Sequence, residues 1–158
     1  MIDVPEVTQS PATLTAVIRF QIPREEIRNI MGPGIEELLA TVLEQGIAPA
    51  GPVFSHYFRM EPGIFDFEIG VPVNQPVTER GRVVPSELLS TTIARTFYHG
   101  GYEGLGAAWG EFGTWIAANG HTPKPDLWES YLIGPESGPD PAKWCTELNR
   151  PLASNSHV

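Results

Sequence analysis

The feature of this sequence that most constrains its fold is a similarity between its two halves. When the two halves are aligned at one constant spacing in residue number, Gly46 aligns with Gly120, Pro49 with Pro123, Phe54 with Trp128, Ser55 with Glu129, and Tyr57 with Tyr131. After a longer turn in the second half the offset shifts, and Glu68 then aligns with Glu147 and Pro72 with Pro151. A duplicated structural unit is the economical explanation of this pattern.

The first half shows a β, α, β, β order. Residues 13–21 alternate apolar and polar side chains, as a half-buried strand does. A short helical turn over residues 24–30 is expected to break at the sequence MGPG, and residues 34–45 then carry an apolar stripe at helical spacing that ends before Gly46. Two strand-like runs, VFSHYFRM and IFDFEIGV, complete the unit.

The second half repeats this order after a connector at residues 74–86 that is rich in turn-forming residues. A strand candidate LLSTTIARTFY precedes a helix over residues 102–119, and the strands LWESYLIG and KWCTELNR follow. The sequence therefore predicts a single α+β domain over residues 1–158, with duplicated βαββ halves at about 12–73 and 87–152.

Strand alternation predicts which side chains face the helices. The predicted helix-facing sets are Phe54, His56, Phe58, Phe65, Phe67, Ile69 and Val71 in the first half and Trp128, Ser130, Leu132, Trp144, Thr146 and Leu148 in the second. If the halves form one twisted sheet with helices on one side, the other side is a concave surface. The residues predicted to line that surface are Tyr57, Asp66, Glu68, Glu129, Tyr131, Cys145 and Glu147.

Carboxylates among aromatic rings suit a lipophilic cation or a planar aromatic ligand. The alternation of Glu129 with Tyr131 and Ile133 in an apolar segment favours a ligand-binding role for Glu129. For Asp66 and Glu68, the simpler interpretation is that they lie on a solvated face. Trp109 has the helical spacing of a core residue but lies near the helix start, where it could line a cleft edge. Cys145 lacks the neighbouring base that a nucleophilic thiol needs.

Composition excludes several classes of function. The formal net charge of −9 argues against direct nucleic-acid binding, which needs clustered Lys and Arg. The single cysteine and the spacing of the histidines predict neither a disulfide framework nor a metal site, and we expect no cofactor. Without a secretory signal or an apolar run long enough to span a bilayer, the sequence predicts a cytoplasmic protein that is not embedded in a membrane; it leaves the oligomeric state open.

Three motifs, HGGYEGLGAAWGEFGTWI, WESYLIGP and TELNRP, resemble in order and spacing the GyrI-like small-molecule-binding family, whose fold is also called effector-binding or SOUL-type. The similarity runs from about Leu14 to Pro151. It implies a pseudo-two-fold, eight-stranded antiparallel sheet with helices on one side and a ligand cleft between the halves. It also implies that Glu129 recognises lipophilic cations, with Glu147 as a second pocket carboxylate and Tyr131 as a pocket aromatic.

The resemblance leaves more than one function open. Family members that regulate transcription carry a DNA-binding region before this domain, but only about a dozen residues precede the first expected strand, so we expect a stand-alone binder of hydrophobic, aromatic, often cationic compounds. The alternative is a hydrolase of reactive cyclopropane-bearing alkylating compounds, in which Glu129, with Tyr131 or Glu147, activates water. A protein-binding module that inhibits a topoisomerase is a third possibility.

Overall fold

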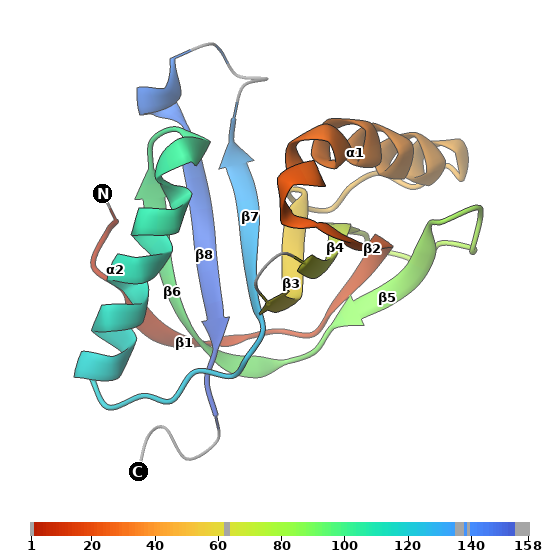
Figure 1. Ribbon diagram of the computed structural model, residues 1–158. Coiled ribbons are helices and arrows are strands. Elements are labelled where there is room, and N and C mark those ends of the chain that lie inside the picture. Colours follow the sequence, from red (N-terminus) through yellow and green to blue (C-terminus); the bar gives the residue numbers. More distant parts are fainter. Residues whose placement is uncertain (1, 62–63, 135–137, 139, 154–158) are drawn as a thin grey trace. The chain divides into compact units, whose positions relative to one another are not determined.

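The computed structural model describes residues 2–61, 64–134, 138 and 140–153 (Figure 1). The described residues form two α-helices and an eight-stranded antiparallel sheet, which confirms the predicted α+β class. The helices are α1 (Ile27–Glu44) and α2 (Leu105–Ala118). The strands are β1 (Glu6–Ser10), β2 (Thr13–Pro23), β3 (Phe54–Glu61), β4 (Ile64–Pro72), β5 (Val84–Leu88), β6 (Thr91–His99), β7 (Leu127–Ile133) and β8 (Cys145–Pro151).

The chain divides into two units by its internal contacts: unit I is residues 11–90, and unit II is residues 1–10 with 91–158. In unit I the strand order is β3-β4-β2-β5, and α1 packs on β2 and β4. A Cβ at Gly34 of α1 would lie 2.9 Å from Ile69 Cδ1 and 3.3 Å from Phe20 Cζ, so glycine allows the helix to approach the strands closely. Leu38 and Val42 of the same helix are fully buried.

The predicted break at MGPG is wrong, because α1 runs without interruption through Pro33. Proline removes one hydrogen bond and disfavours the helical conformation of the residue before it. The buried Leu38 and Val42 on the same helix show the compensating effect, since their packing holds the whole segment against the strands. Tertiary packing therefore overrides the local signal here.

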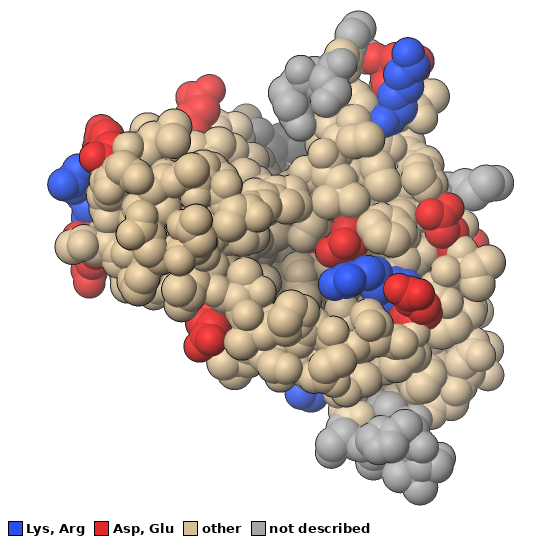
Figure 2. All heavy atoms as spheres, turned by 180° about the vertical axis from the view of Figure 1, so that it is seen from behind, with Lys and Arg blue, Asp and Glu red and all other residues tan. Residues whose placement is uncertain are grey.

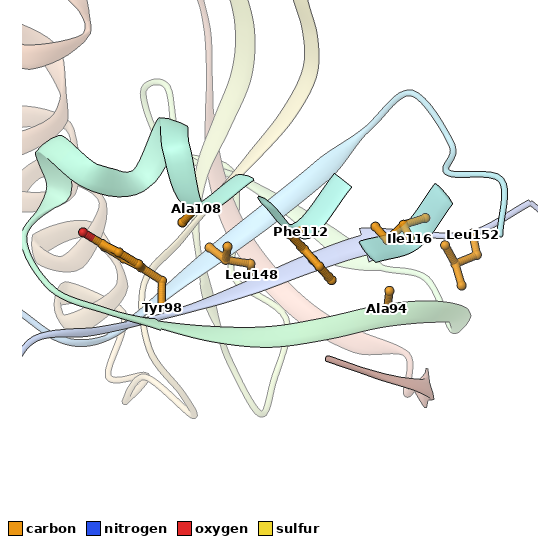
Figure 3. Close-up of a cluster of buried hydrophobic side chains, with 7 residues drawn as sticks. All are labelled: Ala94, Tyr98, Ala108, Phe112, Ile116, Leu148 and Leu152. Carbon is orange, nitrogen blue, oxygen red and sulfur yellow. The ribbon is translucent and has the colours of Figure 1, made fainter. Parts of the chain in front are cut away.

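Unit II has the strand order β1-β6-β8-β7 with α2 packed on it. Figure 3 shows the core of this unit, in which side chains of α2 meet those of β6 and β8. The core residues are Ala94, Tyr98, Ala108, Phe112, Ile116, Leu148 and Leu152. Ala108, Phe112 and Ile116 recur at four-residue spacing, so one stripe of α2 is buried and fixes the rotation of the helix.

Four elements of each unit correspond in order, β2, α1, β3 and β4 in unit I and β6, α2, β7 and β8 in unit II, whereas the edge strand β5 follows its four elements and β1 precedes its own. Both helices end before a glycine in the left-handed conformation, Gly46 with φ of 73° and Gly120 with φ of 77°, as the sequence predicts. The register also shifts at matching places, between Tyr57 and Arg59 in β3 and between Tyr131 and Ile133 in β7. These correspondences agree with a duplication, although the duplication itself and the ligand cleft between the halves stay predictions.

The edge strands β1 and β5 are not predicted by the local patterns of the sequence. β5 lies in the segment that the sequence marks as a connector, where Pro85 pairs with Ala16 of β2. A proline is tolerated on an edge strand because its missing N–H can face away from the ladder. Among the described residues, neither helix combines the length and the apolar character needed to cross a lipid bilayer.

Charged side chains of opposite sign lie close together in the described part of the chain. Arg19 pairs with Asp66 at 2.7 Å, and Arg80 with Glu44 at 3.3 Å. On the face drawn in Figure 2, blue Lys and Arg atoms lie beside red Asp and Glu atoms in small scattered groups. On this face, the drawn Lys and Arg residues do not form the clustered basic surface that binds a phosphate backbone.

Candidate functional site

The strand register places Glu129 and Tyr131 on the face of unit II that α2 covers. Glu129 is paired across the ladder with Leu148, and Tyr131 is paired with Thr146. Directly paired residues in an antiparallel ladder share a face, and Leu148 belongs to the core under α2. The prediction that Glu129 and Tyr131 point away from the helix is therefore wrong.

The cause of this error is that both faces of β7 are buried at its start. Residues 127–130, which include Trp128, Glu129 and Ser130, are all buried. Alternation then separates the two sets of side chains but does not tell which set meets the helix. The large apolar Trp128 is predicted to lie on the helix side, whereas its cross-strand partner is Asn149 on the other side.

The same correction applies to Tyr57 in unit I. Tyr57 is paired with Phe67 and Ser55 with Ile69, which lies beside Gly34 of α1. The Ser55 hydroxyl also lies 3.9 Å from Met31 Sδ of α1. Tyr57 is buried on this helix-facing side, and its ring stacks on that of Phe67 at 5.3 Å.

Glu129 is a buried carboxylate with aromatic hydrogen-bond donors on both oxygens. Its Oε2 accepts a hydrogen bond from Trp109 Nε1 at 2.9 Å, and its Oε1 accepts one from the Tyr131 hydroxyl at 3.0 Å. Glu129 is 6% exposed. Because Trp109 belongs to α2, whose rotation is fixed by its buried stripe, the helix and β7 together orient the carboxylate.

Two further aromatic rings continue from the ring of Tyr131, whose hydroxyl bonds to this carboxylate. The ring of Tyr102 meets that of Tyr131 edge-on at 5.9 Å and that of Trp144 at 5.2 Å. We call the five residues Tyr102, Trp109, Glu129, Tyr131 and Trp144 the Glu129 cluster; all of them belong to unit II. Tyr102 is 37% exposed, so its edge of the cluster meets solvent.

Tyr102 and Trp144 belong to the Glu129 cluster, and sequence reasoning did not place them there. Trp144 is predicted to face the helix, and its contact with Tyr102 is consistent with that side. Tyr102 forms the short 3-10 turn before α2 (Tyr102–Gly104), and aromatic residues at a helix start give no signal of a ligand site by themselves. Trp109, predicted as a possible edge residue, belongs to the cluster through its bond to Glu129.

The structure does not bring Glu147 and Cys145 into this cluster. They alternate with Thr146 and Leu148 on β8 and therefore face the other side of the sheet, so the predicted shared surface with Glu129 is wrong. Glu147 accepts a hydrogen bond from Asn149 Nδ2 at 2.9 Å and lies 3.6 Å from Arg95 Nε. Burial, with the charges of Asp3 and Glu147, raises the pKa of the Cys145 thiol, which disfavours the nucleophilic thiolate.

Asp66 and Glu68 lie on the side of β4 opposite Phe67, as predicted, but Asp66 is not solvated. Its two carboxylate oxygens accept hydrogen bonds from Arg19 Nε at 2.7 Å and Nη2 at 3.0 Å, and the residue is 8% exposed. Burial raises the pKa of the half-buried Glu68. Among the described residues, no three His, Cys, Asp or Glu side chains come together as a metal site would require.

Comparison with solved structures identifies the same fold elsewhere. The C-terminal domain of EcmrR superposes with a TM-score of 0.83 at 21% identity, covering 95% of this chain and 97% of that one. SAV2435 bound to tetraphenylphosphonium gives 0.66 at 12% identity, with 98% and 97% covered. A hydrolase from Listeria innocua gives 0.67 at 13% identity, with 94% and 91% covered.

At these sequence identities, the similarity shows that the proteins share a fold and does not show that they bind the same ligand. A search of curated protein sequences finds no match. The family model described as the GyrI-like small molecule binding domain matches residues 4–153, nearly the whole sequence. The chain therefore belongs to the GyrI-like small-molecule-binding family.

Proposed function

We propose that this domain binds hydrophobic, aromatic, often cationic compounds at the Glu129 cluster, in the cytoplasm. The observation that carries the proposal is the buried Glu129 carboxylate, held by Trp109 and Tyr131 beside the rings of Tyr102 and Trp144. A carboxylate supplies charge to a cation, and the rings supply apolar area and cation–π attraction.

The two hydrogen bonds to Glu129 leave the negative charge of its carboxylate available to attract a cationic ligand. These two donors, an indole N–H and a phenol O–H, are neutral groups, so they fix the orientation of the carboxylate without supplying positive charge. A ligand cation about 6 Å away would gain roughly 3 kcal/mol at an effective dielectric constant near 20, before its desolvation is subtracted. A cation preference of roughly 10- to 100-fold is expected.

Two relatives bear on the ligand and partner classes. The structure of SAV2435 holds tetraphenylphosphonium, a lipophilic aromatic cation. A structure of an EcmrR–DNA complex shows that a longer chain with this domain engages DNA, but the present chain covers only 57% of that chain. We therefore propose a small molecule as the direct partner and expect no direct nucleic-acid binding.

The test uses two probes of similar shape and opposite charge, tetraphenylphosphonium and tetraphenylborate, titrated by calorimetry. The wild-type protein should bind the cation and disfavour the anion. In Glu129→Gln, which keeps the size of the side chain, affinity for the cation should fall roughly 10- to 100-fold.

Glu147→Gln is the matched control, since this carboxylate lies on the other face of the same sheet and also accepts a hydrogen bond, from Asn149 Nδ2. Its affinity for tetraphenylphosphonium should stay within about two-fold of the wild type. Equal binding of the cation by the wild type and Glu129→Gln would refute the assigned role of Glu129.

A hydrolase is the second candidate, favoured by the Tyr131 hydroxyl on Glu129 Oε1 and by the Listeria innocua neighbour described as a hydrolase. Glu129 would take a proton from water as the water oxygen bonds to a cyclopropane carbon. The strained carbon–carbon bond would break, and its electron pair would take up the proton. Mass spectrometry of a cyclopropane-bearing alkylator would detect the water adduct, and formation at the buffer rate would reject this candidate.

A further inference from the structure

Thr146 carries a buried hydroxyl outside the five residues of the Glu129 cluster. The residue is fully buried, and its Oγ1 atom has no hydrogen-bond partner among the described residues. Buried hydroxyls are normally paired because leaving one unpaired forfeits its hydration. An unpaired hydroxyl next to a ligand site is therefore a candidate for ligand recognition.

The register places this hydroxyl beside the Glu129 cluster. Thr146 is paired with Tyr131 on β7 and with Tyr98 on β6, so its side chain shares their α2-facing side. Glu129 pairs with Leu148, the next residue of β8 on that side, so Thr146 and Glu129 are diagonal neighbours. Diagonal neighbours in an antiparallel pair are about 7–8 Å apart, roughly one substituted aromatic ring.

The neighbouring donors are already engaged. Tyr131 and Trp109 donate to Glu129, Trp144 Nε1 donates to Gly138 O at 3.1 Å, and the Tyr98 hydroxyl donates to Gly101 O at 2.7 Å. A ligand acceptor placed among these groups meets donors that would have to give up a bond. The Thr146 hydroxyl can donate at no such cost.

We propose that Thr146 determines specificity within the function proposed above, by donating a hydrogen bond to an oxygen acceptor on the ligand. The ligand class is an aromatic cation whose ring carries an ether, ester or carbonyl oxygen about one ring away from the cationic centre. Glu129 recognises the charge, and Thr146 recognises the oxygen.

The experiment measures the affinity of triphenyl(aryl)phosphonium probes in which one ring carries a methoxy group at the ortho, meta or para position. Each methoxy probe is matched by an ethyl probe of nearly the same size that lacks the acceptor. The wild type should prefer methoxy to ethyl by roughly 3- to 10-fold at one position at least, as one added hydrogen bond predicts. Thr146→Val, which keeps the shape and removes the hydroxyl, should abolish this preference.

Thr96→Val is the control for a purely structural effect. Thr96 is also buried, but its hydroxyl donates to Asp3 O at 2.7 Å, so its loss should lower the melting temperature and leave the methoxy preference unchanged. Thr146→Val should melt at or above the wild-type temperature.

Equal binding of methoxy and ethyl probes by the wild type at all three positions, or a preference that persists in Thr146→Val, overturns the proposal. A different result would show that the proposed function is wrong. The preference for tetraphenylphosphonium over tetraphenylborate would then be absent or would survive Glu129→Gln. If only the Thr146 proposal is wrong, this charge preference remains intact.

Discussion

Trp109→Phe tests whether the bond between α2 and Glu129 is energetically important. The substitution keeps an aromatic ring but removes the indole N–H that lies 2.9 Å from Glu129 Oε2. Hydrogen bonds to charged groups contribute about 1.5–3 kcal/mol. The same substitution also loses ring volume, and this loss must be separated from the loss of the hydrogen bond.

Trp115→Phe provides that separation, because Trp115 lies on the same helix, is half-buried and packs against the same core. The difference between the two variants therefore isolates the bond to Glu129. Urea denaturation should show Trp109→Phe to be less stable than Trp115→Phe by about 1.5–3 kcal/mol. For a chain of this size, that difference corresponds to a melting temperature roughly 3–12 °C lower.

A double-mutant cycle with Glu129→Gln sharpens the result. When Glu129→Gln is already present the acceptor is neutral, so the additional cost of Trp109→Phe should shrink by about 1 kcal/mol. Equal stability losses in Trp109→Phe and Trp115→Phe, together with a cycle that shows no coupling, would refute the reasoning that Trp109 orients the carboxylate.

Two further predictions concern glycine packing and the pH dependence of stability. A Cβ at Gly70 would clash with the Phe54 ring, so Gly70→Ala should lower the free energy of unfolding, measured in urea, by roughly 1–3 kcal/mol. At the exposed helical Gly113 a Cβ would meet nothing within 4 Å, so Gly113→Ala should leave the stability unchanged or raise it by up to about 1 kcal/mol. Similar decreases in the free energy of unfolding for Gly70→Ala and Gly113→Ala would contradict this explanation by side-chain clash. Burial raises the pKa of Glu68 above its ordinary value of 4.5, so the folded chain holds this proton more tightly than the unfolded chain. That contribution is fully present below pH 4.5 and is lost as the pH rises through the folded pKa. Glu68→Gln should therefore have a higher free energy of unfolding than the wild type at pH 7, and this difference should shrink below pH 4.5. A difference between the two proteins that stays constant across this pH range would contradict the prediction.

Much of the fold can be predicted from local patterns. The stripe at residues 34–45, the glycine stops Gly46 and Gly120, and the paired strands after each helix appear in the structure close to their expected places. The edge strands could not be predicted in this way. β5 contains Pro85 and alternates half-buried with exposed residues, and its existence depends on pairing with β2, a contact distant in sequence.

The sequence singles out Glu129 but does not determine which side of the sheet it faces, and its role in ligand binding stays a prediction. Glu129 stands out because a carboxylate interrupts an apolar strand, and the structure does place it in an aromatic cluster. Its side of the sheet depends on which of two buried faces receives α2, and alternation is symmetric with respect to that choice. The β8 strand resolves it: Leu148 is completely buried in the core, so its ladder partner Glu129 must share the helix side.

This change of face alters the chemistry that the sequence suggested. On an open concave surface, Glu129 would share its surroundings with Glu147, and two carboxylates would both act on a ligand. Under α2 it shares its surroundings with Trp109, Tyr131 and Thr146, so one carboxylate is combined with aromatic rings and a hydroxyl. The proposed site would discriminate by one charge and one hydrogen bond, and the charge pair and the methoxy–ethyl pair of probes test these two determinants of affinity separately.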